Sequence, residues 1–181
     1  MESLQSIKDR IPDYAKDLRL NLDAVLNRSS LTPAQANGAA LAAAFAAKSA
    51  PLVAALRDGG IDATQAQAAL TAAALMGMNN VWYPYVEMAA DPELKTMRAE
   101  LRMNAYATHG GVDRTSFELY ALAASIVGKC EFCIQSHYKL LRENGFSTQQ
   151  LRDVGRIAAV VNAVAQVLAV EQARAPESVA P

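Results

Sequence analysis

The chain has 181 residues, enough for one domain or for two small similar halves with a sizeable core. Its 17 Lys and Arg nearly balance its 18 Asp and Glu, so no strongly basic surface points to a nucleic-acid partner. Ala is abundant while Gly and Pro are few, which favours helix.

Residues 1–10 are charged throughout and lack the apolar core of a secretory signal. The apolar stretch 39–47 is too short to span a bilayer, and Asn162 and Gln166 interrupt the stretch 157–170. We therefore expect a soluble cytoplasmic protein with no membrane contact. In that reducing compartment, a close cysteine pair is more often catalytic or metal-binding than a permanent crosslink.

Helix start and stop signals recur along the chain, and no convincing strand is present. They predict helices over residues 33–48, 51–58, 62 to about 80, 92–108, 113–127, 130–144 and 147–172. Gly77 and the pair Asn79-Asn80 are expected to weaken the third helix. Segments 62–90 and 113–145 are loosely alike. We expect residues 1–174 to form one all-helical domain and residues 175–181 to form a disordered tail.

The only two cysteines, Cys130 and Cys133, stand three positions apart, and His137 follows one helical turn later. At 100° per residue, the three side chains fall within roughly 60° of one helix face. Gly128 breaks the preceding helix, so both thiols lie in a first turn, where free N–H groups and the macrodipole favour thiolate. Redox chemistry is the leading interpretation. A zinc site completed by Glu118 and a pair of ordinary buried cysteines are the alternatives.

Several further residues also need an interpretation. The run 115–118 fits a capping box, so Glu118 is structural from its spacing, although a carboxylate there could also orient His137. His109, beside Gly110, is expected to be a solvated helix-end residue.

The aromatic residues Trp82, Tyr83 and Tyr85 could form a pocket wall or a subunit contact, but plain core is the more frequent role. Asn79 and Asn80 could hydrogen-bond across an interface or end a helix.

Several segments together resemble one known family, the alkylhydroperoxidase D proteins of the alkyl hydroperoxide reductase system. These are residues 12–22 (PDYAKDLRLNL), 76–83 (MGMNNVWY), 101–104 (LRMN), 117–119 (FEL) and the motif from Cys130 to His137. The resemblance covers nearly the whole chain, whereas the redox motif alone also occurs across the broader carboxymuconolactone decarboxylase-like superfamily. It implies an all-α helical bundle with a duplicated helical core, a homotrimer and a cytoplasmic antioxidant role.

The resemblance also implies roles for four residues. Cys133 would attack the peroxide and become a sulfenic acid, Cys130 would be the proton donor and resolving thiol, and Glu118 and His137 would relay protons. In many CxxC helices the first cysteine is the attacker, which would favour Cys130 instead. Phe132 stands where the family often has a histidine, and in the helical projection it faces away from the thiols.

The same resemblance implies an enzyme that reduces organic hydroperoxides and regenerates an oxidised peroxiredoxin of the alkyl hydroperoxide reductase C type. Its electrons would come from dihydrolipoamide, supplied by a lipoyl-bearing acyltransferase and dihydrolipoamide dehydrogenase. A redox-active Cys130–Cys133 disulfide would carry them, with no bound cofactor or metal. A decarboxylase-like lyase of the same superfamily is a further alternative, and such an enzyme does not need the cysteine pair.

Overall fold

The computed structural model describes residues 3–174, and over this range it contains helices and no strand, which confirms the all-α prediction. The predicted tail at residues 175–181 lies outside the described residues. The chain begins with three short elements that pack beside the main bundle. They are α1 (Leu4–Asp9), the 3-10 helix η1 (Asp13–Ala15) and α2 (Asp17–Asn27).

The rest of the bundle contains two runs of three helices with the same plan. The first run is α3 (Pro33–Ala46), α4 (Ala50–Asp58) and α5 (Ala63–Ala89). The second is α7 (Arg114–Gly128), α8 (Glu131–Glu143) and α9 (Thr148–Arg174). The duplicated core is therefore present, but the loose likeness of segments 62–90 and 113–145 does not reflect it, because residues 63–89 form a single helix that corresponds to α9.

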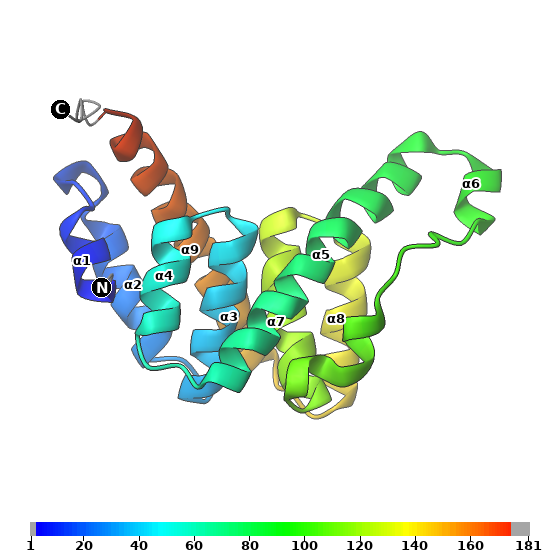
Figure 1. The fold of residues 1–181 in the computed structure, drawn as a ribbon, viewed down its shortest axis with the longest axis horizontal. Helices are drawn as coiled ribbons and strands as arrows, with labels where there is room; N and C mark the ends of the chain where they lie inside the picture. Colours follow the sequence, from blue (N-terminus) through cyan, green and yellow to red (C-terminus); the bar gives the residue numbers. More distant parts are fainter. Residues whose placement is uncertain (1–2, 175–181) are drawn as a thin grey trace, which may run out of the picture.

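The two runs pack through their first helices. Figure 1 shows α3 and α7 side by side at the centre, with α4 and α8 on opposite flanks of this pair. α5 rises to one side of the view and α9 to the other. Close approach of α3 to α7 depends on Gly38, since a Cβ there would lie 2.3 Å from the ring of Tyr120.

α5 continues unbroken through Gly77, Asn79, Asn80 and Pro84, contrary to the predicted weakening. Asn80 does not cap a helix, because its Nδ2 donates to the carbonyl oxygen of Ala124 in α7 at 3.2 Å. Its side chain fills the space that Gly128 leaves open, where a Cβ would stand 2.1 Å from Nδ2. The role of Asn80 is therefore a tertiary contact with α7, although the local sequence pattern predicts that it weakens the helix.

The connection from α5 to α7 is an arm that leaves the bundle and returns to it (Figure 1). α6 (Pro92–Thr96) stands away from the bundle, residues 97–103 are not helical, and the 3-10 helix η2 (Asn104–Gly111) packs back on α5 and α7. The predicted helix over 92–108 is therefore wrong. Gly110 has a φ of 60°, and a Cβ there would lie 2.6 Å from Cα of Ala68, so a backbone contact fixes the returning end.

Among the described helices, α9 alone is long and apolar enough to cross a membrane by length and composition. Val154, Ile157 and Val161 on one side of it belong to the bundle core. A helix that is buried inside a bundle can have the same length and apolar composition as a helix that crosses a membrane. In this structure α9 is a core helix of the bundle.

Candidate functional site at the start of helix α8

The cysteine pair lies where α7 gives way to α8. Lys129 adopts a left-handed conformation with a φ of 56° and turns the chain, so that Cys130 becomes the N-cap of α8. The Cys130 N–H donates to the carbonyl oxygen of Ser125 at 3.3 Å. The helix start predicted at this motif is therefore present. The preceding helix α7 ends at Gly128, and the turn between the two helices is made by Lys129.

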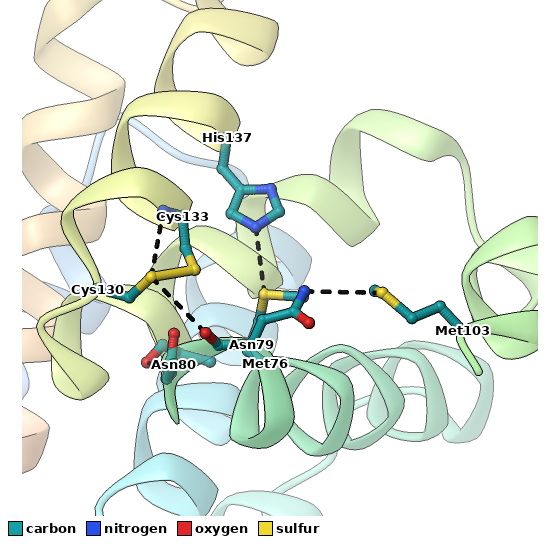
Figure 2. The surroundings of a disulfide bond; sticks show 8 residues. Met76, Asn79, Asn80, Met103, Cys130, Cys133 and His137 are labelled. Carbon is teal, nitrogen blue, oxygen red and sulfur yellow. Dashed lines mark hydrogen bonds between the residues drawn. A yellow bond between two sulfur atoms is a disulfide. The ribbon is translucent and has the colours of Figure 1, made fainter. Parts of the chain in front are cut away.

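The sulfur atoms of Cys130 and Cys133 are joined in a disulfide that faces the bundle interior (Figure 2). The backbone N–H of Cys133 points to Cys130 Sγ at 3.3 Å, and the carbonyl oxygen of Asn79 lies 3.9 Å from the same sulfur. Cys130 is 0% exposed and Cys133 is 3% exposed. A reagent from solvent therefore meets Cys133 first.

His137 and Glu118 form a buried pair beside the disulfide. His137 Nδ1 lies 2.6 Å from Glu118 Oε2, and Glu118 is only 1% exposed. The predicted capping role of Glu118 is wrong, because Asp113 caps α7 by accepting from the N–H of Ser116 at 2.9 Å. One turn further along α7, Glu118 is free to point into the bundle.

The carboxyl group of Glu118 is held in its ionised form. Burial raises its pKa, but hydrogen bonds from His137 and Tyr106 more than offset that effect, so the pKa lies below its ordinary value. The Tyr106 hydroxyl donates to Oε1, and Arg114 lies 3.8 Å away on the exposed side. Because a carboxylate only accepts, Nδ1 of His137 carries a proton, and whenever the ring is neutral Nε2 is its unprotonated nitrogen.

Nε2 of His137 faces the sulfur of Met76 at 3.2 Å, and Figure 2 shows His137, Cys133 and Met76 converging from α8 and α5. We expected His137 to share a proton with the Cys133 thiol. Because Cys133 is in a disulfide in this structure, that expectation stays a prediction for the reduced form. Sequence reasoning assigned no role to Met76 or Tyr106. Met76 precedes Asn79 and Asn80 by one helical turn, which is the signal that could have indicated it.

The three aromatic residues are not in the core, because Tyr85 is exposed and Trp82 and Tyr83 are only partly buried, so the pocket-wall alternative fits Trp82 and Tyr83 better. Trp82 and Tyr83 line a cavity of about 670 Å³ together with Lys129, Glu131 and Phe132. The Tyr83 and Phe132 rings stack with centroids 4.3 Å apart. Phe132 is 54% exposed and points away from the sulfurs, as the helical projection predicted.

His109 is not the solvated residue that we expected. It is partly buried, and its ring packs edge-on against Tyr106 and Phe117, with centroids 5.7 and 5.8 Å away. Within residues 3–174, no three His, Cys, Asp or Glu side chains are grouped as a metal site requires. The zinc alternative therefore has no geometric support in the described part of the chain.

Comparison with known proteins agrees with this architecture. Residues 92–175, which include the arm's return and the second run of helices, match the family model of the Carboxymuconolactone decarboxylase family. This match gives the class to which the dithiol-bearing half belongs.

Whole-chain relatives narrow the class. An "Alkyl hydroperoxide reductase AhpD" of Rhodospirillum centenum is 46% identical over 174 residues, covering 94% of this chain and 93% of the relative. Proteins of the same name from Coxiella burnetii (strain RSA 493 / Nine Mile phase I) and Brucella canis are 42% and 38% identical, covering 98% and 96% of those relatives and 93% and 92% of this chain. The chain belongs to the alkyl hydroperoxide reductase AhpD family.

Proposed function

We propose that this protein is an antioxidant, thiol-dependent alkyl hydroperoxidase whose working group is the Cys130/Cys133 dithiol. The observation that carries the proposal is the disulfide at the start of α8, next to the buried Glu118–His137 pair. A dithiol alone is common to many redox proteins, whereas a neighbouring oriented base suits proton-coupled chemistry at sulfur. The names of the relatives support the same class of reaction.

In the oxidative half-reaction, Nε2 of His137 accepts the proton of the Cys133 thiol. The thiolate attacks one oxygen of the hydroperoxide, so that an S–O bond forms, the O–O bond breaks and an alcohol leaves with a proton. Cys130 then attacks the sulfur of the Cys133 sulfenic acid, forming the disulfide and releasing water. One hydroperoxide is reduced to alcohol and water while two thiols are oxidised.

In the reductive half-reaction, one thiolate of dihydrolipoamide attacks the sulfur of Cys133, the slightly more accessible of the two cysteines, and Cys130 leaves as a thiolate. The Cys133 N–H, 3.3 Å from Cys130 Sγ, is suited to stabilising that leaving thiolate. The second dihydrolipoamide thiol then resolves the mixed disulfide. We propose a lipoyl-bearing acyltransferase and dihydrolipoamide dehydrogenase as the source of these electrons, and an oxidised peroxiredoxin of the alkyl hydroperoxide reductase C type as a second acceptor.

We further propose that the protein works in the cytoplasm as a homotrimer. The last turns of α5 and the arm that follows support self-association, because they carry large apolar side chains that are exposed in the single chain. These are Val81, Tyr85, Met88, Met97 and Leu101. Sedimentation equilibrium should give three times the chain mass, and a monomer at micromolar concentration would contradict the assembly.

A coupled assay tests the function. Dihydrolipoamide, its dehydrogenase and an organic hydroperoxide are supplied, and consumption of NADH is followed for the wild type, Cys133→Ser and the surface control Ser136→Ala. We expect turnover by the wild type and the control and its loss in Cys133→Ser. Equal rates for wild type and Cys133→Ser would overturn the proposal.

Two further measurements separate the alternatives. After treatment with one equivalent of hydroperoxide, the Cys133 sulfenic acid of the Cys130→Ser variant should condense with a monothiol such as 2-mercaptoethanol, giving a stable mixed disulfide and water. Stable trapping only through Cys130, in the Cys133→Ser variant, would reverse the two sulfur roles. Turnover of a lactone acid by the Cys130→Ser/Cys133→Ser double variant would instead favour the decarboxylase-like activity.

A further inference from the structure

The returning end of the arm touches the site at two points. Met103 Sδ lies 3.7 Å from Asn79 Nδ2, and the carbonyl oxygen of Asn79 lies beside Cys130 Sγ. Three residues further along, the hydroxyl of Tyr106 donates to Glu118. One short segment that contains neither cysteine nor histidine of the motif therefore contacts two residues, Asn79 and Glu118, that neighbour the reactive group.

Glu118 has two carboxylate oxygens, and each has a different close partner. Oε2 pairs with Nδ1 of His137, while Oε1 accepts from the Tyr106 hydroxyl. Arg114, on the same helix as Glu118, is 3.8 Å from Oε1 and its side chain is 58% exposed, so it gives only a weak, screened attraction. Tyr106 is therefore the group that fixes the second oxygen.

The Tyr106 ring is itself held in place. It packs edge-on against Phe117 and His109, with centroid distances of 5.7 Å to each. The close contact of Gly110 with the backbone of Ala68 anchors the same 3-10 helix to α5. The hydroxyl thus reaches Glu118 from a fixed direction, and little rotational freedom remains to be lost on making the bond.

We propose that Tyr106 is a positioning residue for the reaction, which holds the Glu118 carboxylate so that Oε2 fixes the Nδ1–H tautomer of His137 and leaves Nε2 free as the base. This inference rests on the proposed function, and it adds a residue from outside the motif to the proton relay. Without the hydroxyl, the carboxylate can rotate within its pocket and His137 loses its preference for the productive tautomer.

The effect on pH dependence has a defined sign. The charged or titratable groups that face Glu118 are His137 from α8, Arg114 from α7 and Tyr106 from η2. Since the Tyr106 hydrogen bond lowers the pKa of Glu118, its removal raises that pKa. The carboxylate is then lost at a higher pH, and the acid limb of the rate profile moves upward.

The test compares Tyr106→Phe with Tyr120→Phe, which removes a buried tyrosine hydroxyl bonded to Gln65 and not to Glu118. We expect kcat of Tyr106→Phe to fall about tenfold with KM for the hydroperoxide unchanged, the size of one hydrogen bond to a charged group. The acid limb should move upward. A site-specific 3-fluorotyrosine at position 106, which keeps ring and hydroxyl, should retain kcat within about twofold.

A second readout does not depend on turnover. The chain has two histidines, so the imidazole ¹⁵N signals of His137 are assigned by their loss in His137→Gln, which leaves the packing of His109 against Tyr106 in place. The wild type should show a protonated Nδ1 in neutral His137, and Tyr106→Phe a mixture of tautomers. An unchanged tautomer together with wild-type kcat would overturn the inference. An inactive wild type would refute the proposed function, and the tautomer alone would then decide the role of Tyr106.

Discussion

The two runs of helices, α3–α4–α5 and α7–α8–α9, share a backbone plan but carry different chemistry. In each run a left-handed lysine, Lys48 or Lys129, turns the chain from the first helix into the second, with φ values of 58° and 56°. A left-handed glycine, Gly60 or Gly145, then leads to a helix of 27 residues. The main difference in length is in the middle helix, which has 9 residues in α4 and 13 in α8.

The candidate reactive residues of the second run have counterparts in the first that carry no thiol, imidazole or carboxylate. Ser49 and Cys130 are the N-caps of α4 and α8, so counting from each cap pairs the side chains along the two helices. Counted in the same way from the caps Thr32 and Asp113, Glu118 pairs with a residue of α3. The counterparts of Cys130, Cys133, His137 and Glu118 are Ser49, Leu52, Leu56 and Asn37. The duplicated scaffold therefore supplies the turn and the helix start, and side chains alone decide which copy can react.

A large effect on turnover is expected from removing the buried carboxylate of Glu118, whose counterpart in the first run is the uncharged Asn37. Glu118→Gln keeps the size of the side chain but cannot fix the tautomer of His137 as a carboxylate does. We expect kcat in the coupled assay to fall about 100-fold, at the low end of general acid–base contributions. Glu143→Gln, on the exposed side of α8, should leave kcat unchanged. A Glu118→Gln enzyme with wild-type turnover would show that the disulfide alone distinguishes the two runs.

Transplanting the cysteines tests whether the shared turn is sufficient. In a Cys130→Ser/Cys133→Ser background, Ser49→Cys and Leu52→Cys place the pair at the start of α4. Leu52 is 0% exposed, so shortening it should lower the free energy of unfolding by about 2 kcal/mol. Because Leu56 and Asn37 stand where the base and carboxylate would be, we expect no hydroperoxide turnover above background. Measurable turnover would mean that the relay is dispensable.

Helices α5 and α9 also differ at one buried position, where α9 carries a hydrogen-bonded carboxylate that stabilises the fold and α5 carries alanine. Asp153 of α9 is 2% exposed and accepts from the Ser30 N–H at 2.9 Å and its hydroxyl at 2.8 Å, whereas its α5 counterpart is Ala68. Burial raises the pKa of Asp153, but the bonds from Ser30, Arg152 and Arg156 hold it well below its usual range. Asp153→Asn should therefore lower the free energy of unfolding by about 2 kcal/mol at neutral pH.

The pH dependence of that loss follows from linkage. A depressed carboxyl pKa stabilises the fold above the unfolded-state pKa of about 3.9, and this stabilisation is lost as pH falls toward the folded-state pKa. The difference between wild type and Asp153→Asn in urea unfolding should thus narrow below about pH 4. Asp58→Asn, at the exposed end of α4, is the control. A difference that grows on acidification would contradict the assigned pKa direction.

The smallest expected effect is one that both runs should share. Lys48 and Lys129 have left-handed backbones, which disfavour any residue with a Cβ. Replacing either by glycine should raise the free energy of unfolding by at most about 1 kcal/mol, because the greater freedom of glycine in the unfolded chain offsets part of the gain. A gain at only one of the two positions would mean that the turns are less alike than their φ values indicate.

The sequence predicted correctly those helix boundaries that depend on interactions between residues close together in the chain. The helix starts at Pro33, after Cys130 and after Ser147 are encoded by caps and breaks within a few residues, and the spacing of Cys130, Cys133 and His137 fixes their shared face. The unbroken α5 depends on the contact of Asn80 with Gly128 and Ala124, far away in sequence, so its stop signals misled. For Glu118, one local pattern suggested a capping box, but Asp113 is the better-placed cap.

The arm was the least predictable part of the site. Its return depends on the approach of Gly110 to Ala68, and the role of Tyr106 depends on a bond to Glu118 across two elements. Neither of these two contacts produces a periodic pattern of residues that could be recognised in the sequence. A tyrosine in a segment with helical propensity has no feature that distinguishes it from an ordinary surface residue.

The disulfide joins residues only three positions apart, at the beginning of one helix. The chain-entropy stabilisation from a crosslink grows with the length of the loop it closes, so this pair contributes at the low end of what disulfides give. Melting temperatures of the oxidised and reduced forms should therefore be close. In the proposed redox cycle the architecture would therefore keep nearly constant stability, and no step would have to wait for the chain to refold.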